Sequence, residues 1–157
     1  MAENLRGATT LYNTYWVRFP RGGATHDTAV ENTNALVNAT KQAGVQKIAH
    51  ISITNPSADS TLGYFRGKAL VEEAIAGSGL AYSIIRPTLV FGAEDVLINN
   101  IAWFLRKFPF FSIPGDGEYL VQPVHVEDVA EAAVNSAGSS ENTIQDCVGP
   151  ETYTYAI

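Results

Sequence analysis

The fold is decided by residues 45–87, which read VQKIAHISITNPSADSTLGYFRGKALVEEAIAGSGLAYSIIRP. Val45 to Thr54 is nearly continuous in apolar residues, which predicts a strand that is buried on both faces. Tyr64 to Ala76 predicts a helix, and Leu80 to Arg86 predicts a second strand that Pro87 ends. A strand, a helix and a strand of these lengths are typical of a parallel sheet covered by helices.

Elements of the same kind extend this unit on both sides. Thr28 begins a capping-box pattern that opens a helix to about Gln42, and Gly44 stops it. The other elements that we expect are strands at 8–15, 121–126 and 143–148 and helices at 95–107 and 127–137. The sequence therefore predicts an α/β fold, a partial Rossmann-like, doubly wound parallel sheet with right-handed crossovers.

Length and composition exclude several classes of function. A chain of 157 residues is sized for one domain, and its net charge of −6 is a poor match for nucleic acid or an anionic membrane surface. The single cysteine, Cys147, excludes an internal disulfide, and His26 and His50 have no partners at metal-ligand spacing, so we expect no metal site. With no apolar run of membrane-spanning length and a polar start at Met1 to Gly7, we predict a cytoplasmic protein.

Tyr64 and Lys68 form the first pattern that carries chemistry. They stand four residues apart in the predicted helix, so both side chains lie on one face. An ammonium group favours the ionised form of a neighbouring phenol, and such a tyrosine can exchange a proton with a substrate hydroxyl or carbonyl. The spacing is equally compatible with an ordinary pair on a helix surface, so it does not decide the function alone.

Two further motifs follow in order, Arg86-Pro87-Thr88-Leu89-Val90-Phe91-Gly92 and Val124-His125-Val126-Glu127-Asp128-Val129-Ala130. Together with Tyr64-Phe65-Arg66-Gly67-Lys68, this ordered set resembles the extended and atypical short-chain dehydrogenase/reductases, the superfamily of NAD(P)-dependent epimerases and dehydratases. The resemblance covers nearly the whole chain. Ile51-Ser52-Ile53-Thr54-Asn55 looks most like the atypical branch, which includes complex I accessory subunits and NAD(P)-binding regulators.

The resemblance implies a role for each matching position. Tyr64 would be the acid/base, Lys68 would hold the nicotinamide ribose of NAD or NADP, and a small-molecule substrate would bind beside them. The positions lining the cofactor would be Asn13, Thr14, Ser52, Lys68, Pro87, Thr88 and Leu89. The positions facing the substrate would be Trp16, Arg18, Asn99, Asn100 and Trp103.

The sequence departs from this family in lacking a Gly-rich turn between a strand and a helix. Gly22-Gly23 is isolated, and without such a turn the pyrophosphate has no backbone cradle at a helix N-terminus. Residues 1–157 are thus expected to be a single domain, the C-terminal portion of an NAD(P)-binding Rossmann-like domain plus part of the substrate lobe, without the N-terminal βαβαβ half. We expect weak or no cofactor binding by this fragment, and possible homo-oligomers through the exposed edge of its sheet.

A second departure concerns the catalytic hydroxyl. The family places it at the position of Ile53, so only a loop distortion that brings in Thr54 would supply it. Two functions follow: a truncated epimerase/dehydratase-type enzyme acting on a sugar-nucleotide-like hydroxyl or carbonyl, or a non-catalytic NAD(P)-binding accessory or regulatory subunit. The Ile53 substitution favours the second.

Aromatic and aliphatic residues gather in the segment 97–111, which contains Trp103 and four phenylalanines. This segment fits the core of a substrate lobe. It also fits an apolar surface for a hydrophobic ligand, a partner subunit or the margin of a membrane, with the acidic net charge against the last.

Overall fold

The computed structural model describes residues 1–113 and 115–154. The helices are η1 (Ala2–Leu5), α1 (His26–Ala43), α2 (Gly63–Ala76), α3 (Val96–Lys107) and α4 (Val126–Ala137). The strands are β1 (Thr10–Asn13), β2 (Lys47–Ile51), β3 (Ala81–Pro87), β4 (Leu89–Phe91), β5 (Leu120–Val121), β6 (Pro123–His125), β7 (Thr143–Cys147) and β8 (Tyr153–Thr154).

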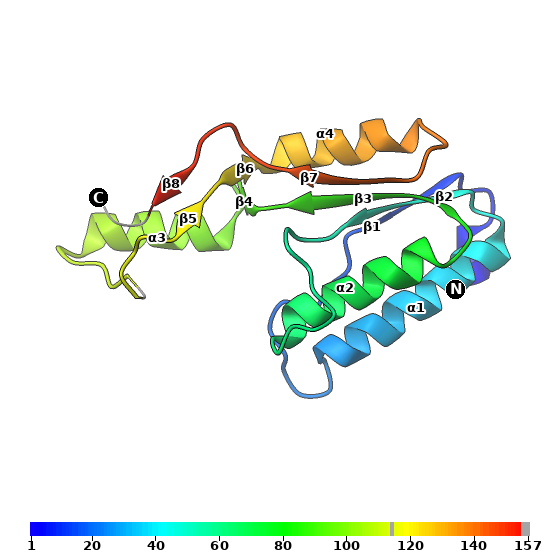
Figure 1. Cartoon of the computed structure of the whole chain (residues 1–157), viewed down its shortest axis with the longest axis horizontal. Coiled ribbons are helices and arrows are strands. Elements are labelled where there is room, and N and C mark those ends of the chain that lie inside the picture. Colours follow the sequence, from blue (N-terminus) through cyan, green and yellow to red (C-terminus); the bar gives the residue numbers. More distant parts are fainter. Residues whose placement is uncertain (114, 155–157) are drawn as a thin grey trace.

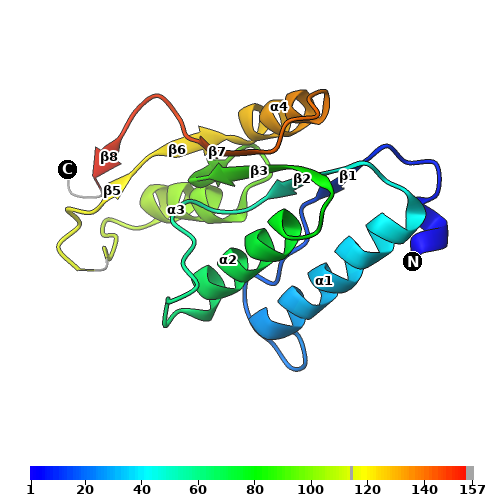
Figure 2. The same cartoon turned by 45° about the vertical axis from the view of Figure 1, so that its right-hand side comes forward.

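A four-stranded parallel sheet in the order β1-β2-β3-β7 forms the centre of the molecule and confirms the predicted fold class. α1 and α2 cover one face of the sheet and α4 covers the other (Figure 1). β4 pairs with β6 and β5 pairs with β8 in two small sheets beyond the carboxyl end of β3. α3 lies at the same end of the molecule as β5 and β8, away from α1 in both views (Figure 2).

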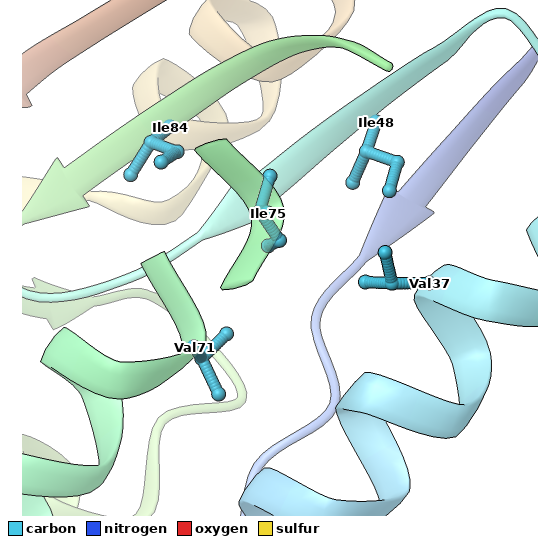
Figure 3. Close-up of a cluster of buried hydrophobic side chains, with 5 residues drawn as sticks. All are labelled: Val37, Ile48, Val71, Ile75 and Ile84. Atoms are coloured by element: carbon cyan, nitrogen blue, oxygen red, sulfur yellow. The ribbon is translucent and has the colours of Figure 1, made fainter. Parts of the chain in front are cut away.

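Two apolar clusters hold the layers together. Figure 3 shows the first, in which side chains from α1, α2, β2 and β3 meet between the sheet and the helix pair: Val37, Ile48, Val71, Ile75 and Ile84. Ile85 points to the opposite face and packs with Val124, Val129 and Ala133 under α4. Adjacent residues of β3 thus serve different clusters, which explains why this strand is apolar at successive positions.

The structure corrects the predicted start of α1. Thr25 is the N-cap, and its hydroxyl accepts a hydrogen bond from the backbone N–H of Thr28 at 3.1 Å. Thr28 is therefore the third helical residue, and its hydroxyl accepts from the backbone N–H of Thr25 at 2.7 Å. The capping box exists, but the short threonine side chain takes the place usually held by Glu or Gln, so the N-cap of α1 lies three residues before the predicted one. The stop at Gly44 is confirmed by its left-handed φ of 78°.

β1, β2 and β7 are shorter than predicted, whereas β3 has the predicted length with its bounds shifted by one residue to Ala81–Pro87. β2 ends at Ile51 instead of Thr54, although the backbone N–H groups of Ser52 and Thr54 still bond to carbonyls of β3. The single extended segment expected at 121–126 is divided between β5 and β6, which belong to different sheets. Asp95 caps α3 as predicted, accepting from the N–H of Ile98 at 2.6 Å.

Candidate functional site

The site is built where β1 and β2 end beneath α2. Asn13 closes β1 directly beside His50 of β2, and both side chains are buried. The Asn13 Nδ2 atom lies 3.0 Å from His50 Nδ1, and the Asn13 carbonyl oxygen lies 3.2 Å from the same nitrogen. The other ring nitrogen, His50 Nε2, is buried without a hydrogen-bond partner among the described residues.

Lys68 projects from α2 to the end of β2. Its side chain is only 3% exposed, its ammonium donates to the Ile51 carbonyl at 2.9 Å, and it lies 4.9 Å from the centre of the Trp16 ring. Burial lowers the pKa of Lys68 to about 8, against the opposing charge of Glu72. Lys68 is therefore not a residue of the helix surface, and that interpretation of the Tyr64–Lys68 spacing is wrong.

Tyr64 stands among aromatic rings at the start of α2. Its ring centroid lies 5.9 Å from that of Trp16 and 5.8 Å from that of His26, both in edge-to-face geometry. Burial raises the pKa of Tyr64, and the nearby charge of Arg18 opposes this only in part. The expected lowering by Lys68 is thus wrong, because burial of the phenol outweighs the neighbouring charges.

Trp16 covers the Tyr64–Lys68 face of α2. A Cβ atom added to Gly67 would lie 2.7 Å from Trp16 Cη2, so the ring fits against α2 only because residue 67 is glycine. The indole Nε1 is buried without a hydrogen-bond partner in the described part of the chain, and so is Nδ1 of His26. The predicted substrate residue Trp16 is therefore a cover over Lys68 in this structure.

Ser52 is committed to a different network. Its hydroxyl donates to Glu72 of α2, and Glu72 also accepts from the Arg86 guanidinium at 2.6 Å. The Arg86 guanidinium is therefore held in an ion pair with a carboxylate of α2. The predicted cofactor role of Ser52 has to compete with a buried hydrogen bond to a carboxylate.

The remaining predicted cofactor residues are spread along the carboxyl end of the sheet. The backbone N–H of Thr54 donates to the carbonyl of Pro87 at 3.1 Å, so these two lie side by side. The Thr88 hydroxyl donates to the carbonyl of Gln122, and Leu89 lines an apolar groove beside α3. Thr14 follows β1 and is exposed.

The predicted substrate residues do not come together. Arg18 is exposed and lines a cavity of about 570 Å³ with Phe91 and His125, whereas Asn100 and Trp103 lie exposed on α3. The Asn99 amide donates to the carbonyls of Ala93 and Asp95 at 2.9 and 2.6 Å and so braces the loop before its own helix. Of the set expected on the substrate side, only Trp16 and Arg18 are near Tyr64.

Sequence reasoning missed His50 and Glu72. His50 interrupts the apolar residues Ile48, Ala49 and Ile51 of β2, and that interruption was the available signal. Among the described residues no three or more His, Cys, Asp or Glu side chains are grouped for a metal ion. No helix in the described ranges is long and apolar enough to cross a membrane.

Comparison with known proteins gives two kinds of relatives. No family model matches the chain. It is 33% identical over 123 residues to the mitochondrial NADH dehydrogenase (ubiquinone) 1 alpha subcomplex subunit 9 of Arabidopsis thaliana, covering 76% of this chain and 30% of that protein. The Mus musculus protein of the same name is 35% identical over 70% of this chain and 29% of its own length. The mitochondrial NADH-ubiquinone oxidoreductase 40 kDa subunit of Neurospora crassa is 27% identical over 98% of this chain and 41% of its own length.

Solved structures show the same fold. MoeE5 in complex with UDP-glucose and NAD matches 98% of this chain and 61% of its own with a TM-score of 0.80 at 20% identity. The dTDP-glucose 4,6-dehydratase DesIV of Streptomyces venezuelae, with NAD bound, matches 98% of this chain and 56% of its own with a TM-score of 0.80 at 22% identity.

These findings correct one prediction and confirm another. The predicted cytoplasmic location is wrong, because the curated relatives are mitochondrial proteins, which a prediction from composition and a polar N-terminus did not detect. The chain spans about 30% of the length of the subunit 9 relatives that it matches. The resemblance found in the motifs is confirmed at the level of the fold: the chain has the fold of the NAD-dependent epimerase- and dehydratase-type short-chain dehydrogenase/reductases, and its curated relatives are mitochondrial NADH dehydrogenase subunits.

Proposed function

We propose that this chain is part of a non-catalytic NAD(P)-binding accessory subunit of a mitochondrial NADH dehydrogenase, with other subunits as its protein partners. The similarity to subunit 9 proteins at 33 and 35% identity supports this assignment. The observation that carries it is the state of the Tyr64–Lys68 pair. The Lys68 ammonium is bound to Ile51 and covered by Trp16, and Ile53 stands at the position of the catalytic hydroxyl.

The proposed role in binding NAD(P) depends on the residues that would lie beside the nicotinamide and its ribose. Lys68 has the donor chemistry to hold a ribose, with Asn13 and Pro87 at the same end of the sheet. The residues described here offer no cradle for a pyrophosphate, because the sequence has no Gly-rich strand-to-helix turn and α1 caps its own N-terminus with Thr25. This part of the dinucleotide site does not fit, so we expect weak or no binding of NAD or NADP by residues 1–157. Residues 1–157 would then form the C-terminal portion of a Rossmann-like domain together with part of a substrate lobe.

A second candidate is the truncated epimerase/dehydratase-type enzyme. The spacing of Tyr64 and Lys68 on the buried face of α2 favours it. In that case Tyr64 would exchange the proton at a hydroxyl or carbonyl of a sugar-nucleotide-like substrate, and Thr54 would have to orient it. The raised pKa of Tyr64 opposes this role, because a general base works best when its pKa is near the operating pH.

Two measurements separate the candidates. NADH and NADPH turnover is measured on a panel of sugar nucleotides and carbonyl compounds for the chain joined to the Gly-rich N-terminal half of a relative, as wild type, as Tyr64→Phe and as the exposed control Tyr12→Phe. A tagged chain is also followed on native gels of mitochondrial membranes. We expect no turnover and migration together with NADH dehydrogenase activity. Turnover that falls by about a hundredfold or more only in Tyr64→Phe would instead establish the enzyme.

A further inference from the structure

α3 is an unusual helix because none of its side chains is buried in the described structure. Trp103 is 54% exposed, Leu105 56% and Phe110, in the segment that follows, 71%. Helices of globular proteins normally bury one apolar stripe against the core. Here the apolar residues remain at the surface, at the end of the molecule farthest from α1 (Figures 1 and 2).

Four exposed rings and the half-buried ring of Phe111 form one continuous patch. The ring centroids of Phe104 and Phe108 lie 4.7 Å apart, and Trp103 lies 5.8 and 6.1 Å from them. Phe110 and Phe111 extend the patch at 6.4 Å from Phe108 and Phe104 respectively. We call these five residues the aromatic patch. Contiguous exposed apolar surface of this kind marks a site of interaction.

A groove beside α3 is also apolar. Ile98, Ile101 and Leu105 line a groove of about 330 Å³ together with Leu89 and Phe111. Leu105 and Phe111 thus connect the groove with the exposed patch. The segment thus offers apolar surface both to the groove and to solvent.

The charges of this segment have one sign. Between residues 96 and 113 the charged residues are Arg106 and Lys107, in the last turn of α3, whereas the whole chain carries a net charge of −6. A helix with exposed Trp, Phe and Leu beside basic residues is typical of a segment that lies in the interface of an anionic bilayer. The acidic remainder is repelled by the same surface, so the charge distribution orients the molecule with α3 toward the membrane.

From this charge complementarity and the exposed rings, we propose that α3 and the segment 108–111 form a docking surface for an anionic phospholipid bilayer. The twelve residues of α3 are too short to span the bilayer, so the helix lies parallel to its plane. The aromatic patch enters the boundary between headgroups and acyl chains. Arg106 and Lys107 meet the headgroup phosphates. The acidic net charge of the chain opposes membrane binding by the rest of its surface, but the surface of α3 carries only basic charges.

The test is sedimentation of the full chain with vesicles of phosphatidylcholine alone or mixed with phosphatidylglycerol. We expect binding to the anionic vesicles that weakens as salt is raised. The double variant Trp103→Ser/Phe110→Ser should lose about tenfold or more in affinity, because these exposed rings no longer enter the bilayer. Arg106→Gln/Lys107→Gln should reduce binding to the level seen with neutral vesicles.

The matched control is Phe19→Ser, which removes an aromatic ring that is 78% exposed but lies in the loop after β1. It should leave vesicle binding unchanged. A blue shift of Trp103 fluorescence on anionic vesicles, measured in a Trp16→Phe background, gives a second readout that keeps all five rings of the aromatic patch. Absence of binding to anionic vesicles, or equal loss of binding in Phe19→Ser, overturns the proposal, and binding to a protein partner alone would do the same.

Discussion

At the residue scale, the buried imidazole of His50 makes stability depend on pH. Burial, together with the charge of Lys68, lowers the pKa of His50 from 6.5 to about 3 in the folded protein. The unfolded chain therefore binds a proton at a higher pH than the folded chain does. The stabilisation is complete above pH 6.5 and is lost as the pH falls toward 3. We expect the free energy of unfolding to decrease by up to about 1.4 kcal/mol per pH unit in this window from His50 alone.

The measurement is urea unfolding between pH 3 and 8 for the wild type and for His50→Gln, which has an amide in place of the titrating ring. The difference in slope between the two proteins isolates the contribution of His50, because the carboxylates titrate in both. His26→Gln is the matched control, since it removes another imidazole from the same region. Identical slopes for the wild type and His50→Gln would contradict the buried, neutral state of this ring.

At the element scale, the contact between the β1–α1 loop and α2 depends on Gly67. Alanine is the better helix former by about 1 kcal/mol, but its Cβ would lie 2.7 Å from the Trp16 ring. We expect Gly67→Ala to displace Trp16 and to destabilise the protein by about 1–3 kcal/mol through overpacking. The displaced ring exposes Lys68, so the lysine pKa should rise from about 8 toward 10.5.

The pKa of Lys68 is followed by NMR titration of its labelled side chain. Gly63→Ala is the matched control in the same helix, because its added Cβ meets its nearest atom at 3.8 Å, an ordinary contact. That variant should leave both the stability and the Lys68 pKa close to the wild type. An unchanged Lys68 pKa in Gly67→Ala would mean that Trp16 does not cover the ammonium.

The elements themselves were largely predictable from the sequence. Continuous apolar residues fixed β2 and β3, and local signals such as Gly44 and Asp95 placed helix ends correctly. The start of α1 was wrong, because a threonine at the third helical position bonds backward in place of a carboxylate. A capping box can be recognised in a sequence only when its third helical residue is the usual Glu or Gln.

The site was less predictable, since its partners are distant in the chain. The motif identified Tyr64 and Lys68, but the contact of His50 with Asn13 joins residues 37 positions apart. Nothing local in the sequence indicates that Trp16 covers Lys68 or that Glu72 binds both Ser52 and Arg86. These contacts arise from the order of strands in the sheet, which brings the carboxyl ends of β1, β2 and β3 together.

At the scale of the whole molecule, β1 is an edge strand of the described sheet, and this edge favours self-association. The carbonyl of Thr9 accepts from the N–H of Lys47, so residues at alternate positions from Thr9 face β2. Tyr12 is at one of the intervening positions, so its backbone N–H points away from β2 and out of the sheet. We predict that the wild-type chain forms oligomers through this edge and that Tyr12→Pro, which removes the outward N–H, makes it monomeric.

Light scattering over a range of protein concentrations measures the mass of each variant. Tyr12→Ala is the matched control, because it removes the same half-exposed ring but keeps the N–H group. Strand pairing predicts that Tyr12→Ala remains oligomeric while Tyr12→Pro does not, whereas contacts made by the ring predict that both dissociate. A wild-type chain that stays monomeric at every concentration contradicts association through β1, and the edge would then have to be protected by its short length of four residues alone.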